Sequence, residues 1–97
     1  MKKQLHSDIQ KAVKDWLQWH GYFVYWNKAG LGTYKGVSDL VAIKGGRASW
    51  IEIKTGEKDG LNHNQEIFKE EIRKHGGEYH RIWTIDQLEQ MEIRRML

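Results

Sequence analysis

Two carboxylates and a lysine stand in two apolar segments that a short glycine turn joins. Asp39 lies in the segment 37–43, and Glu52 and Lys54 lie in the segment 48–54. Both segments are rich in β-branched and large apolar residues, which favours strands. The intervening Gly45-Gly46 predicts a hairpin, since glycine tolerates the positive φ that tight turns need. A two-residue loop, and equally a four-residue loop, places Asp39 directly opposite Glu52, whereas an odd-length loop would not.

This register would put the three side chains on one face of the sheet. Directly paired residues have Cβ atoms about 4.5–5.5 Å apart, and Lys54, two residues beyond Glu52, shares its face. Facing carboxylates in apolar strands repel and are costly to bury. A hard divalent cation would remove the repulsion, polarise a phosphoryl oxygen and lower the pKa of a water molecule. Lys54 would then stabilise developing negative charge or orient the attacking water.

A structural interpretation of the same residues stays open. Asp39 could cap the turn at the entry to its strand, and Glu52 and Lys54 could lie on a solvated face of an ordinary antiparallel sheet. An isolated E-x-K triplet favours that interpretation, and only the derived pairing of Asp39 with Glu52 weighs against it.

Three motifs together resemble a known nuclease family. Gly36-Val37-Ser38-Asp39-Leu40-Val41, Trp50-Ile51-Glu52-Ile53-Lys54 and Leu61-Asn62-His63-Asn64-Gln65 are similar to the pattern of the virus-type replication-repair nuclease (VRR-NUC) domain of the PD-(D/E)xK superfamily. The resemblance runs from about residue 7 to 83. It implies a restriction-endonuclease-like fold and a Mg²⁺- or Mn²⁺-dependent nuclease acting on branched DNA, such as a Holliday junction.

The same resemblance implies roles for particular residues. Asp39, Glu52, Lys54 and Gln65 would be catalytic, and the backbone carbonyl of Ile53 would join the two carboxylates as a metal ligand. A structural interpretation of Gln65 is also open: it could be the capping-box partner of Asn62. Both roles could hold.

His6 stands where the family usually has a glutamate in its first helix. On a helical wheel it lies at the edge of the apolar stripe, so it could approach the site and contact metal or water. A helix-terminal histidine without a role is the alternative, and the departure leaves the number of metal ions open.

The remaining elements follow from periodicity and stop signals. The first helix has apolar residues at Leu5, Ile9, Val13, Trp16 and Leu17, with Ser7 as N-cap and Gly21 as its end. We expect strands over 22–26 and 78–83, a helix from Asn62 to Gly76-Gly77, and a last helix capped by Thr84. The predicted order is α-β-β-β-α-β-α: a single α/β domain over residues 1–97, with a central mixed sheet flanked by helices.

Composition narrows the setting of the protein. The 97 residues carry a formal charge of +3 and no cysteine, which excludes disulfides and thiolate metal sites, and the histidines lack zinc spacing. No apolar run approaches the roughly 20 residues that span a bilayer, so we expect no membrane association. The lack of cysteine agrees with a cytoplasmic location, and the family resemblance implies a bacterial or phage-infected cell. Lys28, Tyr34, Lys35 and Lys58 lie in loops beside the site and could contact DNA, although a solvated loop would look similar.

The leading hypothesis is a structure-selective DNA endonuclease. The alternative is a nucleic-acid-binding module of the same fold with reduced or lost catalysis, of which His6 would be the sign. Because a junction has two strands to cut, we also expect a homodimer, with Trp19 as an exposed aromatic and Tyr22 just beyond it as interface candidates. Trp19 covering the edge of a small core is the competing interpretation.

Overall fold

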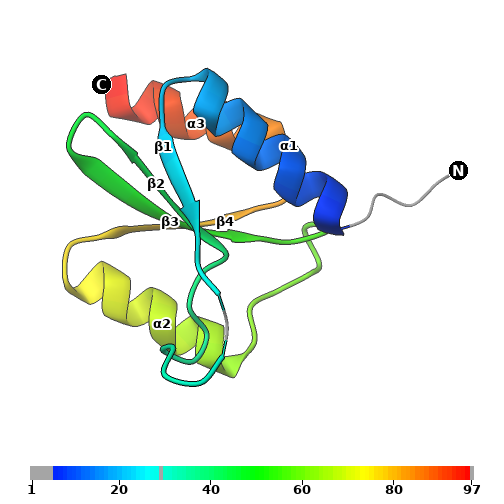
Figure 1. Ribbon diagram of the computed structural model, residues 1–97, viewed down its shortest axis with the longest axis vertical. Helices are drawn as coiled ribbons and strands as arrows, with labels where there is room; N and C mark the ends of the chain where they lie inside the picture. Colours follow the sequence, from blue (N-terminus) through cyan, green and yellow to red (C-terminus); the bar gives the residue numbers. More distant parts are fainter. Residues whose placement is uncertain (1–5, 29, 97) are drawn as a thin grey trace, which may run out of the picture.

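The computed structural model describes residues 6–28 and 30–96, which form three helices and one four-stranded sheet (Figure 1). The elements, in order, are α1 (His6–Trp19), β1 (Phe23–Trp26), β2 (Leu40–Lys44), β3 (Arg47–Ile53), α2 (His63–Lys74), β4 (Glu78–Ile82) and α3 (Ile85–Met96). This is the predicted α-β-β-β-α-β-α order. Among the described residues, no helix is long and apolar enough to cross a membrane.

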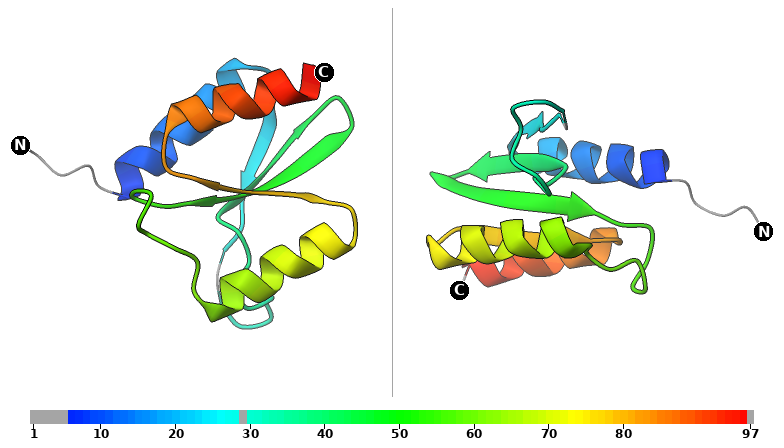
Figure 2. Two further views of the ribbon diagram at one scale, coloured as in Figure 1. Left: turned by 180° about the vertical axis from the view of Figure 1, so that it is seen from behind. Right: turned by 90° about the horizontal axis from the view of Figure 1, so that it is seen from below.

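The sheet is mixed and its strands lie in the order of the sequence. β1 pairs antiparallel with β2, β2 antiparallel with β3, and β3 parallel with β4. The parallel pair requires a crossover, which α2 supplies. Figures 1 and 2 show α1 and α3 together on one side of the strands and α2 on the other.

Strand alternation divides the buried residues between the two faces. On the α1–α3 face, Leu40, Ala42, Ile51 and Ile53 pack against apolar residues of the two helices, namely Ile9, Val13, Leu17, Leu88 and Met91. On the α2 face, Tyr79 contacts Phe68, with ring centroids 6.1 Å apart. The second face also carries Glu52, which is only 4% exposed. The sheet thus has an apolar face and a face that combines aromatic residues with a buried carboxylate.

The β2–β3 hairpin has the predicted register. Gly45 and Gly46 have φ angles of 59° and 77°, the left-handed conformation that a two-residue hairpin loop requires. Lys44 faces Arg47, and the pairing continues to Leu40 opposite Ile51. One step beyond this last pair, Asp39 and Glu52 are the next residues on their two chains.

Several predicted boundaries are wrong by one to three residues. Helix α1 begins at His6, so Ser7 lies inside its first turn and is not the N-cap; the predicted apolar residue Leu5 lies outside the described residues. The second strand begins at Leu40 and not at Val37, because the Val37 N–H donates to Tyr34 O in a turn. β3 begins at Arg47 and ends at Ile53, and β4 ends at Ile82.

A charged cluster fastens the far end of the sheet to α3. The Glu78 carboxylate accepts hydrogen bonds from Ser49 Oγ at 2.9 Å and Arg95 Nη2 at 3.0 Å, and it pairs with Arg47. Arg95 also donates to the Tyr22 hydroxyl at 3.1 Å. Tyr22 is 4% exposed, so the prediction that it belongs to an exposed interface is wrong: its ring fills the core and its hydroxyl has a partner there.

Replacing Glu78 should test this cluster. Burial raises the pKa of Glu78, but hydrogen bonds from Arg95, Ser49 and Arg47 outweigh that effect and lower the pKa to about 2. A lowered pKa contributes stability above the ordinary value of 4.5 that is lost as pH falls toward 2. Glu78→Gln should therefore reduce the free energy of unfolding by about 2–3 kcal/mol at pH 7, and by progressively less below pH 4.5. Urea unfolding from pH 7 to pH 3 checks this; a difference that does not change with pH would contradict it.

Candidate active site

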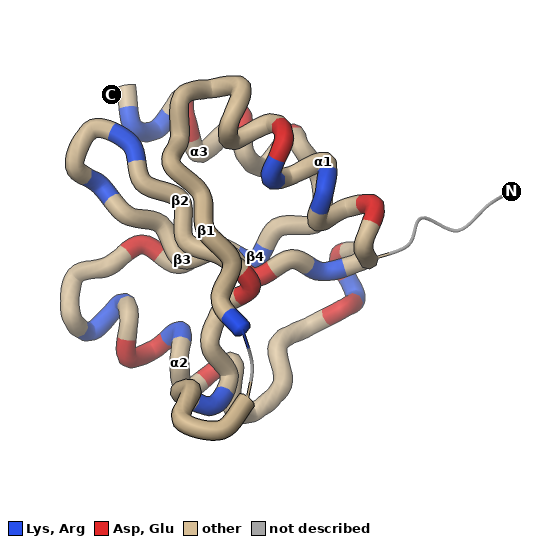
Figure 3. Tube along the Cα trace, in the orientation of Figure 1, with Lys and Arg blue, Asp and Glu red and all other residues tan. Residues whose placement is uncertain are grey.

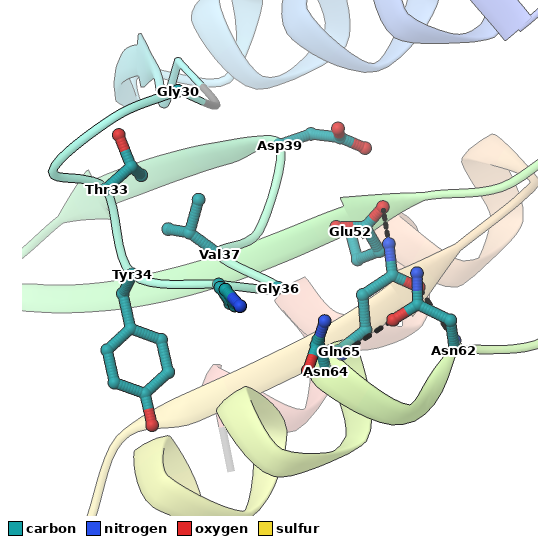
Figure 4. A pocket seen from close by; sticks show the side chains of 11 residues that line it. Gly30, Thr33, Tyr34, Gly36, Val37, Asp39, Glu52, Asn62, Asn64 and Gln65 are labelled. Carbon is teal, nitrogen blue, oxygen red and sulfur yellow. Dashed lines mark hydrogen bonds between the residues drawn. The ribbon is translucent and has the colours of Figure 1, made fainter.

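Asp39 and Glu52 lie side by side at the end of the β2–β3 ladder (Figure 4). Asp39 immediately precedes β2, and its backbone carbonyl accepts the Asn27 N–H at 2.9 Å. Its Oδ2 accepts the Ile53 N–H at 2.7 Å, which ties the carboxylate to the neighbouring strand. The Asp39 side chain is 23% exposed and the Glu52 side chain 5%. The pair therefore has one carboxylate at the surface and one beneath it.

Gln65 connects Glu52 to Lys54 from the first turn of α2. Its Nε2 donates to Glu52 Oε2 at 3.3 Å, and its Oε1 accepts from Lys54 Nζ at 3.0 Å. The same Oε1 accepts the Asn62 N–H at 3.0 Å, while Asn62 Oδ1 accepts the Gln65 N–H at 2.9 Å. Gln65 is thus the predicted capping-box partner and a bridge within the site at once.

Lys54 is held close to the carboxylates although it follows the end of β3. Its backbone N–H donates to Ile82 O at 2.8 Å, so the chain remains attached to β4. Its Nζ is 4.0 Å from Glu52 Oε2, and its side chain is 13% exposed. A cation so placed offsets part of the charge of Glu52.

His6 reaches the site from the start of α1. Its Nε2 is 2.7 Å from the carbonyl oxygen of Ile53, the predicted third metal ligand, and 4.0 Å from Asp39 Oδ2. The carbonyl can accept only from a protonated ring nitrogen, so this Nε2 is the donor. The contact fastens the N-terminal part of α1 to the end of β3.

The loop before β2 forms a wall of the site. Gly36 has φ of 78°, and a Cβ there would lie 2.2 Å from the Asn64 carbonyl oxygen, so only glycine allows this close approach to α2. Together the loop, Asp39, Glu52 and the start of α2 enclose a cavity of about 510 Å³. Its wall includes two of the predicted DNA-contacting residues, Tyr34 and Lys35.

The other two predicted DNA contacts lie away from that wall. Lys28 and Lys58 are exposed and do not line the cavity around the carboxylates. Figure 3 shows basic positions along the helices and in the hairpin as well as in these loops. The charge distribution by itself therefore does not single out one face.

Asn64 is a residue of the cavity for which no separate role is predicted above. It lines the cavity together with Asn62 and Gln65. Its position in the first turn of a capped helix could have indicated that it lies at the site. The start of a helix brings successive polar side chains and free N–H groups close together.

The surroundings of Glu52 disfavour its charged form. Burial and the charge of Asp39 raise its pKa to about 8, against a smaller opposing effect of Lys54. Among the described residues, its Oε1 is buried without a hydrogen-bond partner. Buried polar atoms normally have partners, so this oxygen has the capacity to bind a further group.

The oxygen atoms of this site are suited to a hard divalent cation. Two carboxylates and the Ile53 carbonyl are oxygen ligands, and Mg²⁺ commonly takes only one or two carboxylates and completes its shell with water and substrate phosphate. No group of three or more histidine, aspartate or glutamate side chains suited to a metal occurs within residues 6–28 and 30–96. Any ion here would therefore depend on the carbonyl, on water or on substrate oxygens for the rest of its shell.

A solved structure has the same fold as this chain. A solved structure described as a "VRR_NUC domain" matches 89% of this chain and 91% of its own, with a TM-score of 0.77 and 21% sequence identity. No protein-family model and no curated protein matches the sequence. The chain therefore has the fold of a VRR_NUC domain, as the resemblance in its motifs implied.

Neutralising Glu52 should change how stability depends on pH. A carboxyl group whose pKa rises from 4.5 to about 8 on folding binds protons more tightly in the folded state, so the free energy of unfolding falls as pH rises through this window. In EDTA, Glu52→Gln should therefore be more stable than the wild type at pH 8.5, by about 1–3 kcal/mol, with the difference shrinking toward pH 5. Glu89→Gln, exposed on α3, is the matched control. Parallel melting curves for wild type and variant would contradict the prediction.

Proposed function

We propose that the chain is a metal-dependent deoxyribonuclease that hydrolyses phosphodiester bonds, with residues 1–97 forming one VRR-NUC-like nuclease domain. The observation that carries the proposal is the buried Glu52, whose Oε1 has no partner among the described residues, beside Asp39 on one sheet face. Burying Glu52 beside a second carboxylate is unfavourable. Binding of a cation at this place would account for the arrangement. The VRR_NUC fold supports the same conclusion.

Asp39 and Glu52 would hold Mg²⁺ or Mn²⁺, with the Ile53 carbonyl as a third ligand. A bound ion of this kind supplies a Lewis acid for the phosphoryl oxygen and lowers the pKa of water. Both carboxylates would supply oxygen ligands, Asp39 as the more exposed of the two and Glu52 as the buried one. The Ile53 N–H keeps Asp39 in position for this role, because its hydrogen bond restricts the carboxylate to one orientation.

Lys54 and Gln65 have different parts in the chemistry. Lys54 Nζ would stabilise negative charge on the phosphate as the bond breaks, an interaction that matters most in the transition state. Gln65 positions Lys54 by accepting its hydrogen bond at 3.0 Å, and it positions Glu52 through its amide nitrogen at 3.3 Å. Because Asn62 holds Gln65 from the other side, the cap of α2 orients the site.

The substrate is DNA, preferentially branched DNA such as a Holliday junction. Lys35 and Tyr34 on the cavity wall, with Lys28 and Lys58 further out, would contact the phosphate backbone of the strand entering the site. We place this activity in the cytoplasm of a bacterial or phage-infected cell, where branched DNA is found; without cysteine, the chain needs no oxidising compartment to form disulfides.

One observation favours the alternative, a DNA-binding module that has lost catalysis. His6 Nε2 lies 2.7 Å from the Ile53 carbonyl, so it engages the oxygen that the proposed ion needs as a ligand. An enzyme must release this contact or keep His6 beside the ion, whereas a binding module can retain it permanently.

Cleavage assays separate the two functions. The protein should cut DNA with Mg²⁺ or Mn²⁺ and stop in EDTA, over a set of duplex, flap, splayed-arm and four-way substrates. Lys54→Ala should lower kcat by about 10²–10³-fold, the usual effect of removing one group that stabilises developing charge, while DNA and metal binding persist. Lys11→Ala, an exposed residue of α1 paired with Asp15, is the control. Glu52→Gln should instead weaken metal binding in calorimetry.

The outcomes are distinct. Full cleavage by Lys54→Ala would remove Lys54 from the mechanism. A gel shift that is equal with and without metal, together with no cleavage of any substrate, would establish the binding module and overturn the nuclease.

We expect the active form to be a two-fold homodimer, because one chain offers one site and a junction has two strands to cut. Trp19 is 88% exposed on α1, and aromatic residues are enriched at interface centres. Light scattering at micromolar protein should give twice the 11.5 kDa of one chain, and Trp19→Glu should return it to the single mass. A mass of one chain with and without junction DNA, accompanied by undiminished junction cleavage, would show that the dimer is not required.

A further inference from the structure

A row of side chains crosses the sheet beside the carboxylates. Tyr25 pairs with Val41, Val41 with Trp50, and Trp50 with Tyr79, so the row includes a residue of each strand. Asp39 and Glu52 precede Val41 and follow Trp50 by two residues, and side chains two apart lie on the same face. This row of three aromatic residues and Val41, here called the aromatic row, is therefore parallel to the carboxylate pair, about 7 Å away along the strands.

Helix α2 covers only part of this row. Its Phe68 packs on Tyr79, which is 3% exposed, and α2 packs against β4. Tyr25 on the edge strand is left 43% exposed, and Trp50 is partly exposed. Aromatic surface thus remains open to solvent between the helix and the edge strand.

Tyr34 and Trp50 form the walls of a separate apolar hollow. This hollow of about 370 Å³ is lined by Tyr34, Trp50, Phe68 and Ile72, with the polar residues Glu71 and His75 also on its lining. Tyr34 lies 5.7 Å from Phe68, centroid to centroid, and remains 55% exposed. Tyr34 also lines the cavity that contains Asp39 and Glu52, and Figure 4 shows its ring directed away from them, toward α2. One residue therefore borders both spaces.

We propose that Tyr34 and Trp50 form a base-binding site that takes an unpaired nucleobase adjacent to the cleaved phosphodiester. This inference rests on the proposed nuclease function, because it places the neighbouring phosphate at Asp39 and Glu52. Aromatic rings bind any base by stacking on its π-face. The Glu71 carboxylate offers acceptors for the polar edge of a base, and His75, whose Nδ1 donates to the Glu71 carbonyl, has its Nε2 as a second polar atom on the lining. Lys35, beside Tyr34, lies on the carboxylate cavity toward which the backbone phosphate would run.

The site would select for DNA structure and not for sequence. A base inside a duplex is covered on both faces by its neighbours and cannot enter a hollow, whereas a base at a branch point or in a single strand can be turned out. The short distance between the aromatic row and the carboxylates would then direct cleavage to a phosphodiester next to an unpaired nucleotide.

The test compares binding of two labelled DNAs in EDTA, which prevents metal-dependent cleavage. Fluorescence anisotropy measures a splayed-arm DNA and a blunt duplex with the same paired sequence. The wild type should prefer the splayed arms, and Tyr34→Leu should weaken that binding by about 5- to 100-fold, the range expected for the loss of one stacked base. Binding of the blunt duplex should fall less than binding of the splayed arms. Tyr34→Phe, which keeps the ring, should retain the wild-type preference for splayed arms, and Ile93→Ala, at an exposed apolar residue of α3, should match the wild type for both DNAs.

Tryptophan fluorescence reports the same site without mutation of Tyr34. Addition of an unlabelled single strand should quench the emission, and part of the quenching should disappear in Trp50→Phe. Thermal melting of each variant confirms that it folds.

Several results would overturn the proposal. The first is an unchanged splayed-arm preference in Tyr34→Leu. The second is an equal loss of affinity for both DNAs in that variant. The third is a mass of Tyr34→Leu in light scattering that differs from the wild-type mass, which would assign the hollow to contact between copies of the chain. An intact preference in a protein that never cleaves DNA would uphold the base site and reject the nuclease, whereas cleavage without the preference would do the reverse.

Discussion

The repulsion between Asp39 and Glu52 is the constraint around which the rest of the site is arranged. The Gly45-Gly46 turn sets a register that brings the two carboxylates together, and the burial of Glu52 prevents water from screening them. Each neighbouring contact offsets part of this cost: the Ile53 N–H on Asp39, the Gln65 amide on Glu52, and Lys54 Nζ 4.0 Å away. One oxygen of Glu52 stays without a partner among the described residues, and a cation would complete the balance.

The first turn of α2 shows how structural and chemical roles combine in one residue. Gln65 closes a capping box with Asn62, which stabilises the helix start, and the same side chain bridges Glu52 and Lys54. Gly36 brings the opposite loop within contact of Asn64, so the cap also fixes the wall of the cavity. A helix cap that served stability alone would not need partners on β3 and on the loop.

Stability and site chemistry are separated along the sheet. At one end, Glu78 is held by Arg95, Ser49 and Arg47, and its lowered pKa reflects a carboxylate that its partners stabilise. At the other end, burial and Asp39 raise the pKa of Glu52. The two carboxylates lie on the neighbouring strands β4 and β3 of one small domain. Of the two, Glu52 alone has a buried oxygen without a hydrogen-bond partner among the described residues.

The order of elements and the Asp39–Glu52 register were determined by the sequence itself, because a two-residue glycine turn and strand periodicity are local properties. The tight capping of α2 at Asn62 and Gln65 was likewise local. Tertiary structure alone decided the rest. Tyr22 lies in the core and its hydroxyl accepts from Arg95, which is distant in the sequence. His6 contacts the Ile53 carbonyl at the end of β3. Tyr34 joined two cavities because Gly36 lets its loop pack on α2. Such contacts depend on how separate elements pack, and no local pattern encodes that packing.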